Sequence, residues 1–153
     1  GPLAALVAVT AASGAFVAGN DAGRAYNTFP LMDGRIIPEE YWGDGRLPFW
    51  RNALENTAAV QFHHRALAVS TLSAVVAVWG VSRGLPLPPS THASLHALLG
   101  MACAQVSLGV ATLLYHVPVS LGSAHQAGAL TLFSILVGAL HTLRVPAPAV
   151  ARA

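Results

Sequence analysis

The stretch that decides the fold is residues 57–81, TAAVQFHHRALAVSTLSAVVAVWGV, an apolar run with two histidines and an arginine near its start. A helix needs around 20 apolar residues to cross the hydrocarbon core of a bilayer. This run is long enough, so it predicts a membrane-spanning helix. Ionisable side chains inside such a helix are costly and mark candidate functional residues. His63, His64 and Arg65 are therefore the first candidates.

Three further apolar runs have spanning length: residues 2–19, 91–115 and 121–143. The chain of 153 residues is 54% hydrophobic and only 9% charged, whereas soluble domains carry about a quarter charged residues. Without water to satisfy backbone groups, such runs must be helices. The sequence thus predicts an all-α fold, a single four-helix transmembrane bundle over residues 1–153, with membrane lipid as a partner and no nucleic acid. Because the first residue is not Met and an apolar run begins almost at once, we expect a fragment or a processed product.

All six acidic residues of the chain fall in the loop between residues 20 and 56, beside four arginines. Arg83 and Arg144 lie near the other ends of the spans with no acidic residue beside them. Basic residues near span ends favour the inner side of a membrane, so we expect the 20–56 loop outside and both termini inside. The loop is also rich in aromatic residues, which favour packing over the mouth of the bundle, with a solvated connector as the alternative.

The seven histidines divide by their depth in the predicted spans. Four would lie toward the outer face: His63, His64, His116 and His125. Three would lie toward the inner face: His92, His96 and His141. The inner group has no acidic residue near it to complete a metal site or to orient an imidazole, so we expect interfacial side chains there. The role of His116 stays unassigned.

His64 and His125 lie at matching depth on two spans that both run from the outer face inward. A haem with two histidine ligands requires such a pair, because the ligands approach the iron from opposite faces. Small residues around both positions would leave room for a flat macrocycle. The alternative is that both histidines only form hydrogen bonds between helices.

Two neighbours of His64 have open roles at this point. His63 competes with His64, because successive helical residues point about 100° apart and only one of the two can face the bundle axis. The Arg65 guanidinium could pair with a haem propionate, since arginine binds carboxylates through two parallel hydrogen bonds. It could equally reach out to the lipid headgroups.

Motifs for other chemistry are absent from the sequence. There is no CxxC, HExxH or GxSxG motif and no glycine-rich phosphate loop. The one cysteine, Cys103, lies inside a predicted span and cannot form a disulfide within the chain.

Three stretches resemble the C-terminal half of the haem A synthase family, which includes bacterial CtaA and mitochondrial Cox15. They are GAFVAGNDAGRAYNTFPLMDGRIIPEEYW at 14–42, RNALENTAAVQFHHRALA at 51–68 and PVSLGSAHQAGALTLF at 118–133. The resemblance implies two similar four-helix halves in an eight-helix protein of the bacterial cytoplasmic membrane or the mitochondrial inner membrane. It also implies an enzyme that oxidises the C8 methyl of the substrate haem O to the formyl group of haem A, for terminal oxidases.

The resemblance further implies that this half holds a haem b. Its two iron ligands fall on His64, in the motif QFxHR, and on His125, in the motif AHQAGA, so that His63 occupies the variable position. Gln61 and Arg65 belong to the same motif and are expected beside the cofactor. Expected partners are the N-terminal half of the same protein, haem O synthase and a second copy of the chain.

Gln61 distinguishes this chain from the N-terminal half of the family. The N-terminal half of the family carries an ExxHR version of the motif, with a glutamate where this chain has Gln61. A glutamate could take a proton from a substrate, whereas glutamine can only form hydrogen bonds. This chain is therefore expected to handle electrons, with no catalytic residue assigned. The alternatives are a b-type cytochrome module that transfers electrons without methyl oxidation, and a membrane scaffold without haem.

Overall fold

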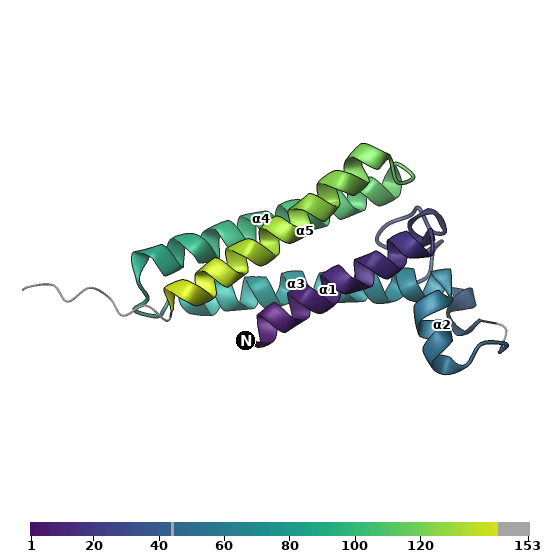
Figure 1. The fold of residues 1–153 in the computed structure, drawn as a ribbon, viewed down its shortest axis with the longest axis horizontal. Coiled ribbons are helices and arrows are strands. Elements are labelled where there is room, and N and C mark those ends of the chain that lie inside the picture. Colours follow the sequence, from purple (N-terminus) through teal and green to yellow (C-terminus); the bar gives the residue numbers. More distant parts are fainter. Residues whose placement is uncertain (44, 144–153) are drawn as a thin grey trace, which may run out of the picture.

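The computed structural model describes residues 1–43 and 45–143, and this part of the chain is helical (Figure 1). Asp44, Arg144 and Arg152 lie outside the described residues. The elements, in chain order, are α1 Pro2–Gly19, η1 Ala22–Arg24, η2 Glu39–Trp42, α2 Phe49–Glu55, α3 Thr57–Ser82, α4 Pro89–Leu114 and α5 Val119–Thr142. The described residues contain no β-strand, only an isolated bridge between Met32 and Arg35. The predicted all-α fold is confirmed.

Four of these helices, α1, α3, α4 and α5, are long and apolar enough to cross a membrane. Their bounds lie within two residues of the predicted spans. The chain is thus a multi-pass membrane protein. The short helix α2, inside the loop, was not predicted.

The four long helices run up and down along one axis (Figure 1). α1 packs mainly on α3, α4 mainly on α5, and the two pairs join through contacts of α3 with α4 and of α1 with α5. α3 and α5 are therefore diagonal to each other across the bundle. The N-terminus and the end of α5 lie at one end of the bundle, and the 20–56 loop lies at the other. We call these the far end and the loop end.

Helix boundaries follow from local sequence. Pro2 and Pro89 each occupy the first turn of a helix, where the missing N–H is not needed. The Asn56 side chain caps α3 by accepting hydrogen bonds from the backbone N–H groups of Ala58 and Ala59, at 2.9 and 3.4 Å. This cap fixes where α3 begins, and with it the depth at which His64 lies.

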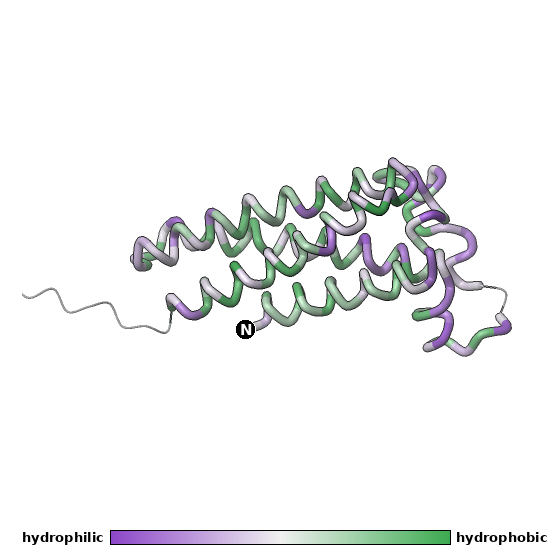
Figure 2. Tube along the Cα trace, turned by 45° about the horizontal axis from the view of Figure 1, so that its top comes forward, coloured by the Kyte–Doolittle hydropathy of each residue, from purple (hydrophilic) through white to green (hydrophobic). Residues whose placement is uncertain are grey.

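The apolar core fills the far half of the bundle. It consists of Val7, Val75, Leu95, Leu98, Ala102, Leu132 and Leu136. Hydrophilic residues gather instead at the loop end (Figure 2). The site histidines of α3 and α5 lie in the interior of the loop half, outside this core.

The loop packs on the loop end of the bundle. Asn27 donates a hydrogen bond from Nδ2 to the backbone oxygen of Leu113 in α4, at 2.7 Å. Gly23 lies against Val117, so closely that a β-carbon at position 23 would be 3.0 Å from Val117 Cγ2. Val117 has a φ of 60°, which is unfavourable for a β-branched residue. These contacts tie the loop to the turn between α4 and α5, as expected for a loop that covers the bundle mouth.

Candidate functional site

His64 and His125 face each other across the interior of the loop half. Their ring centroids are 6.4 Å apart and their ring planes are nearly perpendicular, at 89°. They come from α3 and α5, which lie diagonally across the bundle. The two side chains therefore meet in its interior. The sequence indicated that these two residues lie at matching depth, and the structure places their imidazole rings next to each other.

α1 forms a cradle for the His64 ring. A β-carbon at Gly14 would be 3.1 Å from His64 Cε1, so any side chain there would require the ring to shift by a few tenths of an ångström. Ser13 Oγ lies 2.8 Å from His64 Nδ1 and 2.7 Å from the backbone oxygen of Thr10. A hydroxyl has one hydrogen to donate, and the Thr10 carbonyl can only accept. Ser13 therefore donates to Thr10 and accepts from the Nδ1–H of His64, which leaves the Nε2 lone pair free.

α4 forms the corresponding cradle for His125. A β-carbon at Gly109 would be 2.9 Å from His125 Cε1. The Nδ1 atom of His125 is buried and forms no hydrogen bond to a side chain of the described residues, but the backbone of Gln105 in α4 lies within hydrogen-bonding reach of the ring. Gln105 donates from Nε2 to the backbone oxygen of His125, at 2.8 Å. Its own Oε1 is without a partner in the described structure and lies over Gly128, where a β-carbon would be 2.2 Å away.

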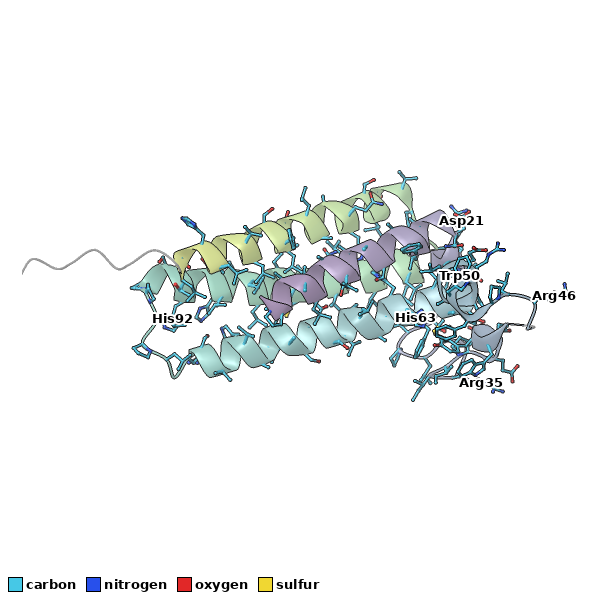
Figure 3. The ribbon with its side chains drawn as sticks, turned by 60° about the horizontal axis from the view of Figure 1, so that its bottom comes forward. Asp21, Arg35, Arg46, Trp50, His63 and His92 are labelled. Atoms are coloured by element: carbon cyan, nitrogen blue, oxygen red, sulfur yellow. The ribbon has the colours of Figure 1, made fainter. Side chains whose placement is uncertain are left out.

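His63 points away from this pair. Its Nε2 is 3.0 Å from the Tyr41 hydroxyl oxygen in η2, and its ring packs edge to face on Tyr41 and Phe62. Figure 3 shows His63 at the loop end of the bundle. The structure therefore brings His64, and not His63, to His125, as the family motif implied.

Arg65 and Gln61 hold the loop. The two terminal nitrogens of Arg65 donate to the backbone oxygens of Thr28 and Tyr26, at 2.9 and 2.8 Å. Gln61 Nε2 donates to the Tyr26 oxygen as well, at 3.1 Å. This role was not predicted. Arg65 Nε and Gln61 Oε1 remain buried without a partner among the described residues.

Ion pairs lie in the loop, outside the spans. Arg51 binds Glu55 through two parallel hydrogen bonds of 2.7 Å, which lower the pKa of the Glu55 carboxyl. The Tyr26 hydroxyl donates to Glu40. Burial and the neighbouring Glu40 carboxylate raise the pKa of Tyr26 to about 12, and the same hydrogen bond lowers the pKa of Glu40.

The far-end histidines form no comparable site. His96 Nδ1 lies 2.7 Å from the backbone oxygen of His92, and the His96 ring packs on Trp79, over which Arg83 lies at 5.0 Å. Figure 3 shows His92 at this end. Within residues 1–43 and 45–143, no three histidine, cysteine or acidic side chains are placed to hold a metal ion together.

The fold and the paired imidazoles define a class: a multi-pass helical membrane protein with two histidines opposed across its interior. Residues 2–137 match the COX15-CtaA family, described as "Cytochrome oxidase assembly protein". The chain belongs to this family, and the resemblance drawn from its motifs is confirmed.

Similar proteins carry the name of one enzyme. The chain is 52% identical over 147 residues to "Heme A synthase COX15" of Arabidopsis thaliana, covering 96% of this chain and 32% of that protein. It is 46% identical over 142 residues to "Heme A synthase" of Nitrosospira multiformis, covering 93% and 39%. For "Heme A synthase COX15" of Homo sapiens the identity is 43% over 141 residues, covering 92% and 34%. The chain thus spans about a third of the length of these relatives. No solved structure matches it.

Proposed function

We propose that this chain is the haem-b-binding half of a haem A synthase, with His64 and His125 as the two axial ligands of the iron. The observation that carries the proposal is the 6.4 Å separation of the two ring centroids. A metal–imidazole bond is about 2.0–2.1 Å long, so two imidazoles on opposite sides of one metal have centroids roughly 6 Å apart. The observed distance fits that geometry.

The surroundings of the two rings support ligation over a purely structural role. The hydrogen bond to Ser13 leaves Nε2 of His64 with a free lone pair. If these histidines served only as hydrogen-bonding links between helices, they would be expected to bond to each other or to α1 and α4 through every polar atom.

When bound, a haem b supplies a reversible one-electron change at its iron. The chain's part is to hold that iron between His64 and His125 in the low-dielectric interior of the bundle. Arg65 Nε is the donor left for a carboxylate of the cofactor, and Gln61 Oε1 is a free acceptor. Gln61 cannot take up a proton as a carboxylate would. The methyl oxidation of haem O is therefore assigned to the N-terminal half of the full protein, which we propose as the partner of this one.

The alternative is a b-type cytochrome module that transfers electrons without methyl oxidation. The absence of a carboxylate at position 61 fits this alternative equally well. Cells that express the full-length protein and make haem O should accumulate haem A under our proposal. They should accumulate none if the protein only transfers electrons. The membrane is proposed to be the bacterial cytoplasmic or the mitochondrial inner membrane.

The ligand pair is tested by haem binding to the chain purified in detergent. The wild-type chain should bind one haem per chain with the absorption spectrum of a low-spin iron. His64→Ala and His125→Ala should each lose that spectrum. His63→Ala and His92→Ala are matched controls, because they remove an imidazole from α3 and from the far end. Low-spin haem retained in the His64→Ala or His125→Ala variant would refute the proposed ligands.

A further inference from the structure

The short helix α2 crosses the loop end of the bundle instead of following its axis, and it projects beyond the side of the bundle (Figure 1). Three of its apolar side chains are exposed: Phe49 at 80%, Trp50 at 63% and Leu54 at 41%. Contiguous apolar surface of this kind marks a site that binds a protein or a membrane. The proposed function assigns no role to this surface.

The exposed surface of α2 has an apolar side and a charged side. Successive helical residues are about 100° apart, so residues four apart lie on the same side of a helix. Trp50 and Leu54 form one such pair. Arg51 and Glu55 form the next pair, and two hydrogen bonds of 2.7 Å join their side chains. An apolar side next to a charged side is typical of a helix that lies in the surface of a bilayer.

The depth of α2 matches a bilayer surface. α1 has 18 residues and is therefore about 27 Å long, close to the thickness of a hydrocarbon core, about 30 Å. The membrane boundary then lies near Asn20, just after α1. Asn20 donates from Nδ2 to the backbone oxygens of Phe16 and Leu54, at 2.8 and 3.0 Å, which holds α2 at this level. Figure 3 shows Trp50 and Asp21 at one level along the bundle.

The apolar side of α2 adjoins the apolar surface of a membrane-spanning helix. Phe16 lies in the last turn of α1 and is 44% exposed. The Asn20 amide joins its carbonyl oxygen to that of Leu54. The exposed apolar surface of α1 therefore continues around the membrane boundary onto α2, where Trp50 and Leu54 extend it sideways.

We propose that α2 is an interfacial helix, which inserts Phe49, Trp50 and Leu54 between the phospholipids of the leaflet at the loop end. The apolar side of such a helix lies roughly 5–10 Å into the boundary between headgroups and acyl chains. Tryptophan suits this position because its ring is apolar and its N–H can bond to headgroups. Asn56 both ends α2 and caps α3, so the anchored helix sets the depth at which α3 begins. The inference does not depend on haem binding.

Spin labels on the full-length protein in phosphatidylcholine vesicles distinguish lipid, water and protein around α2. The native cysteines, including Cys103, are first replaced by alanine. Labels on Trp50→Cys and Leu54→Cys should collide often with oxygen, which dissolves in lipid, and rarely with a water-soluble nickel chelate. Arg51→Cys is the matched control on the charged side and should show the reverse. Leu130→Cys on α5, at an exposed apolar position, is the reference for a lipid-facing label.

Two results would overturn the proposal. If the nickel chelate reaches the label at position 50 more readily than oxygen does, α2 stays in water. If neither reagent reaches it, protein covers α2, and the N-terminal half is then the occupant. Both results leave the proposed haem ligands untouched, because haem is not measured.

The charge of α2 gives a second expectation. Arg51 and Glu55 are the charged residues of the helix and cancel each other, so insertion should depend on acyl chains and not on headgroup charge. Replacing part of the phosphatidylcholine with phosphatidylglycerol should leave the oxygen accessibility at position 50 unchanged. Insertion only in the presence of phosphatidylglycerol would contradict the proposed mode of binding.

Fluorescence of Trp50 tests the native side chain and so stands even if the labelled variants fold poorly. The chain has three tryptophans, and Trp42→Phe with Trp79→Phe leaves only Trp50. In vesicles its emission should be quenched more by phospholipids brominated near the carbonyl end of the acyl chain than by those brominated near the methyl end, because the expected depth is shallow. Emission that neither brominated lipid quenches would overturn the proposal.

Discussion

Gly109 on α4 and His125 on α5 approach so closely that a β-carbon on the glycine would lie 2.9 Å from Cε1 of the imidazole. Real β-carbons essentially never come so close, so a side chain at position 109 must displace the ring. Gly14 packs less tightly on His64, at a distance of 3.1 Å, where a β-carbon would require the ring to shift by only a few tenths of an ångström. Each helix that carries a site histidine is thus paired with a helix that leaves space for it.

Replacing this glycine should therefore damage the site and spare the fold. Gly109→Ala should lower haem affinity about tenfold, the scale of effects for misoriented ligands. Its thermal stability without haem should not fall, because alanine is favoured over glycine in a helix by about 1 kcal/mol. Gly100→Ala on the same helix is the control, since nothing lies within 4 Å of its β-carbon. Haem titration and thermal unfolding of both variants separate the two effects, and equal haem affinities would contradict the prediction.

Gly128 allows a second close approach, between α5 and Gln105. A β-carbon there would lie 2.2 Å from Gln105 Oε1, so Gly128→Ala should expel the Gln105 side chain and break its bond to the His125 carbonyl. We expect a loss of about 1–3 kcal/mol in the free energy of unfolding, typical of a buried polar group left without its partner.

A double-mutant cycle checks this mechanism. Gln105→Ala removes the clashing amide, so adding Gly128→Ala to it should cost little. If Gly128→Ala is equally harmful with and without Gln105, the clash is not the cause.

The spans and the ligand candidates could be predicted from sequence because they depend on composition and depth. Residues 57–81 are long and apolar enough to define α3, and the start of α5 places His125 level with His64. Both follow from the thickness of a bilayer.

The cradles around the two rings could not be predicted. Lipid is as apolar as the bundle interior, so apolar side chains do not mark which face of a membrane helix points inward. The sequence therefore did not indicate that Ser13 and Gly14 face His64, or that Gly109 faces His125. The role of Arg65 was missed for a different reason, because it depends on the path of residues 26–31 through a loop without regular structure.

The hydrogen bonds of Arg65 lead to a prediction about the loop. Arg65→Ala removes the donors to the Tyr26 and Thr28 carbonyls, so the segment around them should detach more often from α3. Trypsin should then cleave after Arg35, which is exposed, several-fold faster than in the wild-type chain. Arg83→Ala at the far end is the control and should leave the cleavage rate unchanged. Equal cleavage of the two variants would show that Arg65 does not hold the loop.

The hydrogen bond between Tyr26 and Glu40 makes the order of the loop depend on pH. The pKa of Glu40 is lowered by this bond, so its contribution is present above the ordinary carboxyl pKa of 4.5 and is lost as the pH falls through the lowered value. The pKa of Tyr26 is raised from 10.0 to about 12, so its contribution is complete below pH 10 and is lost as the pH rises toward 12. The loop should be best ordered between these limits.

Fluorescence of Trp42, whose ring packs on Tyr41 at 4.8 Å in the same part of the loop, can follow this transition. The wild-type chain should show one change in emission below pH 4.5 and another between pH 10 and 12. Tyr26→Phe removes the donor and the phenol, so the alkaline change should disappear and the acidic change should move to higher pH, toward the ordinary carboxyl pKa. The pair of Arg51 and Glu55 also titrates in acid, but it is identical in both proteins, so the difference between their curves isolates the Tyr26 bond. Superimposable curves would mean that this bond does not order the loop.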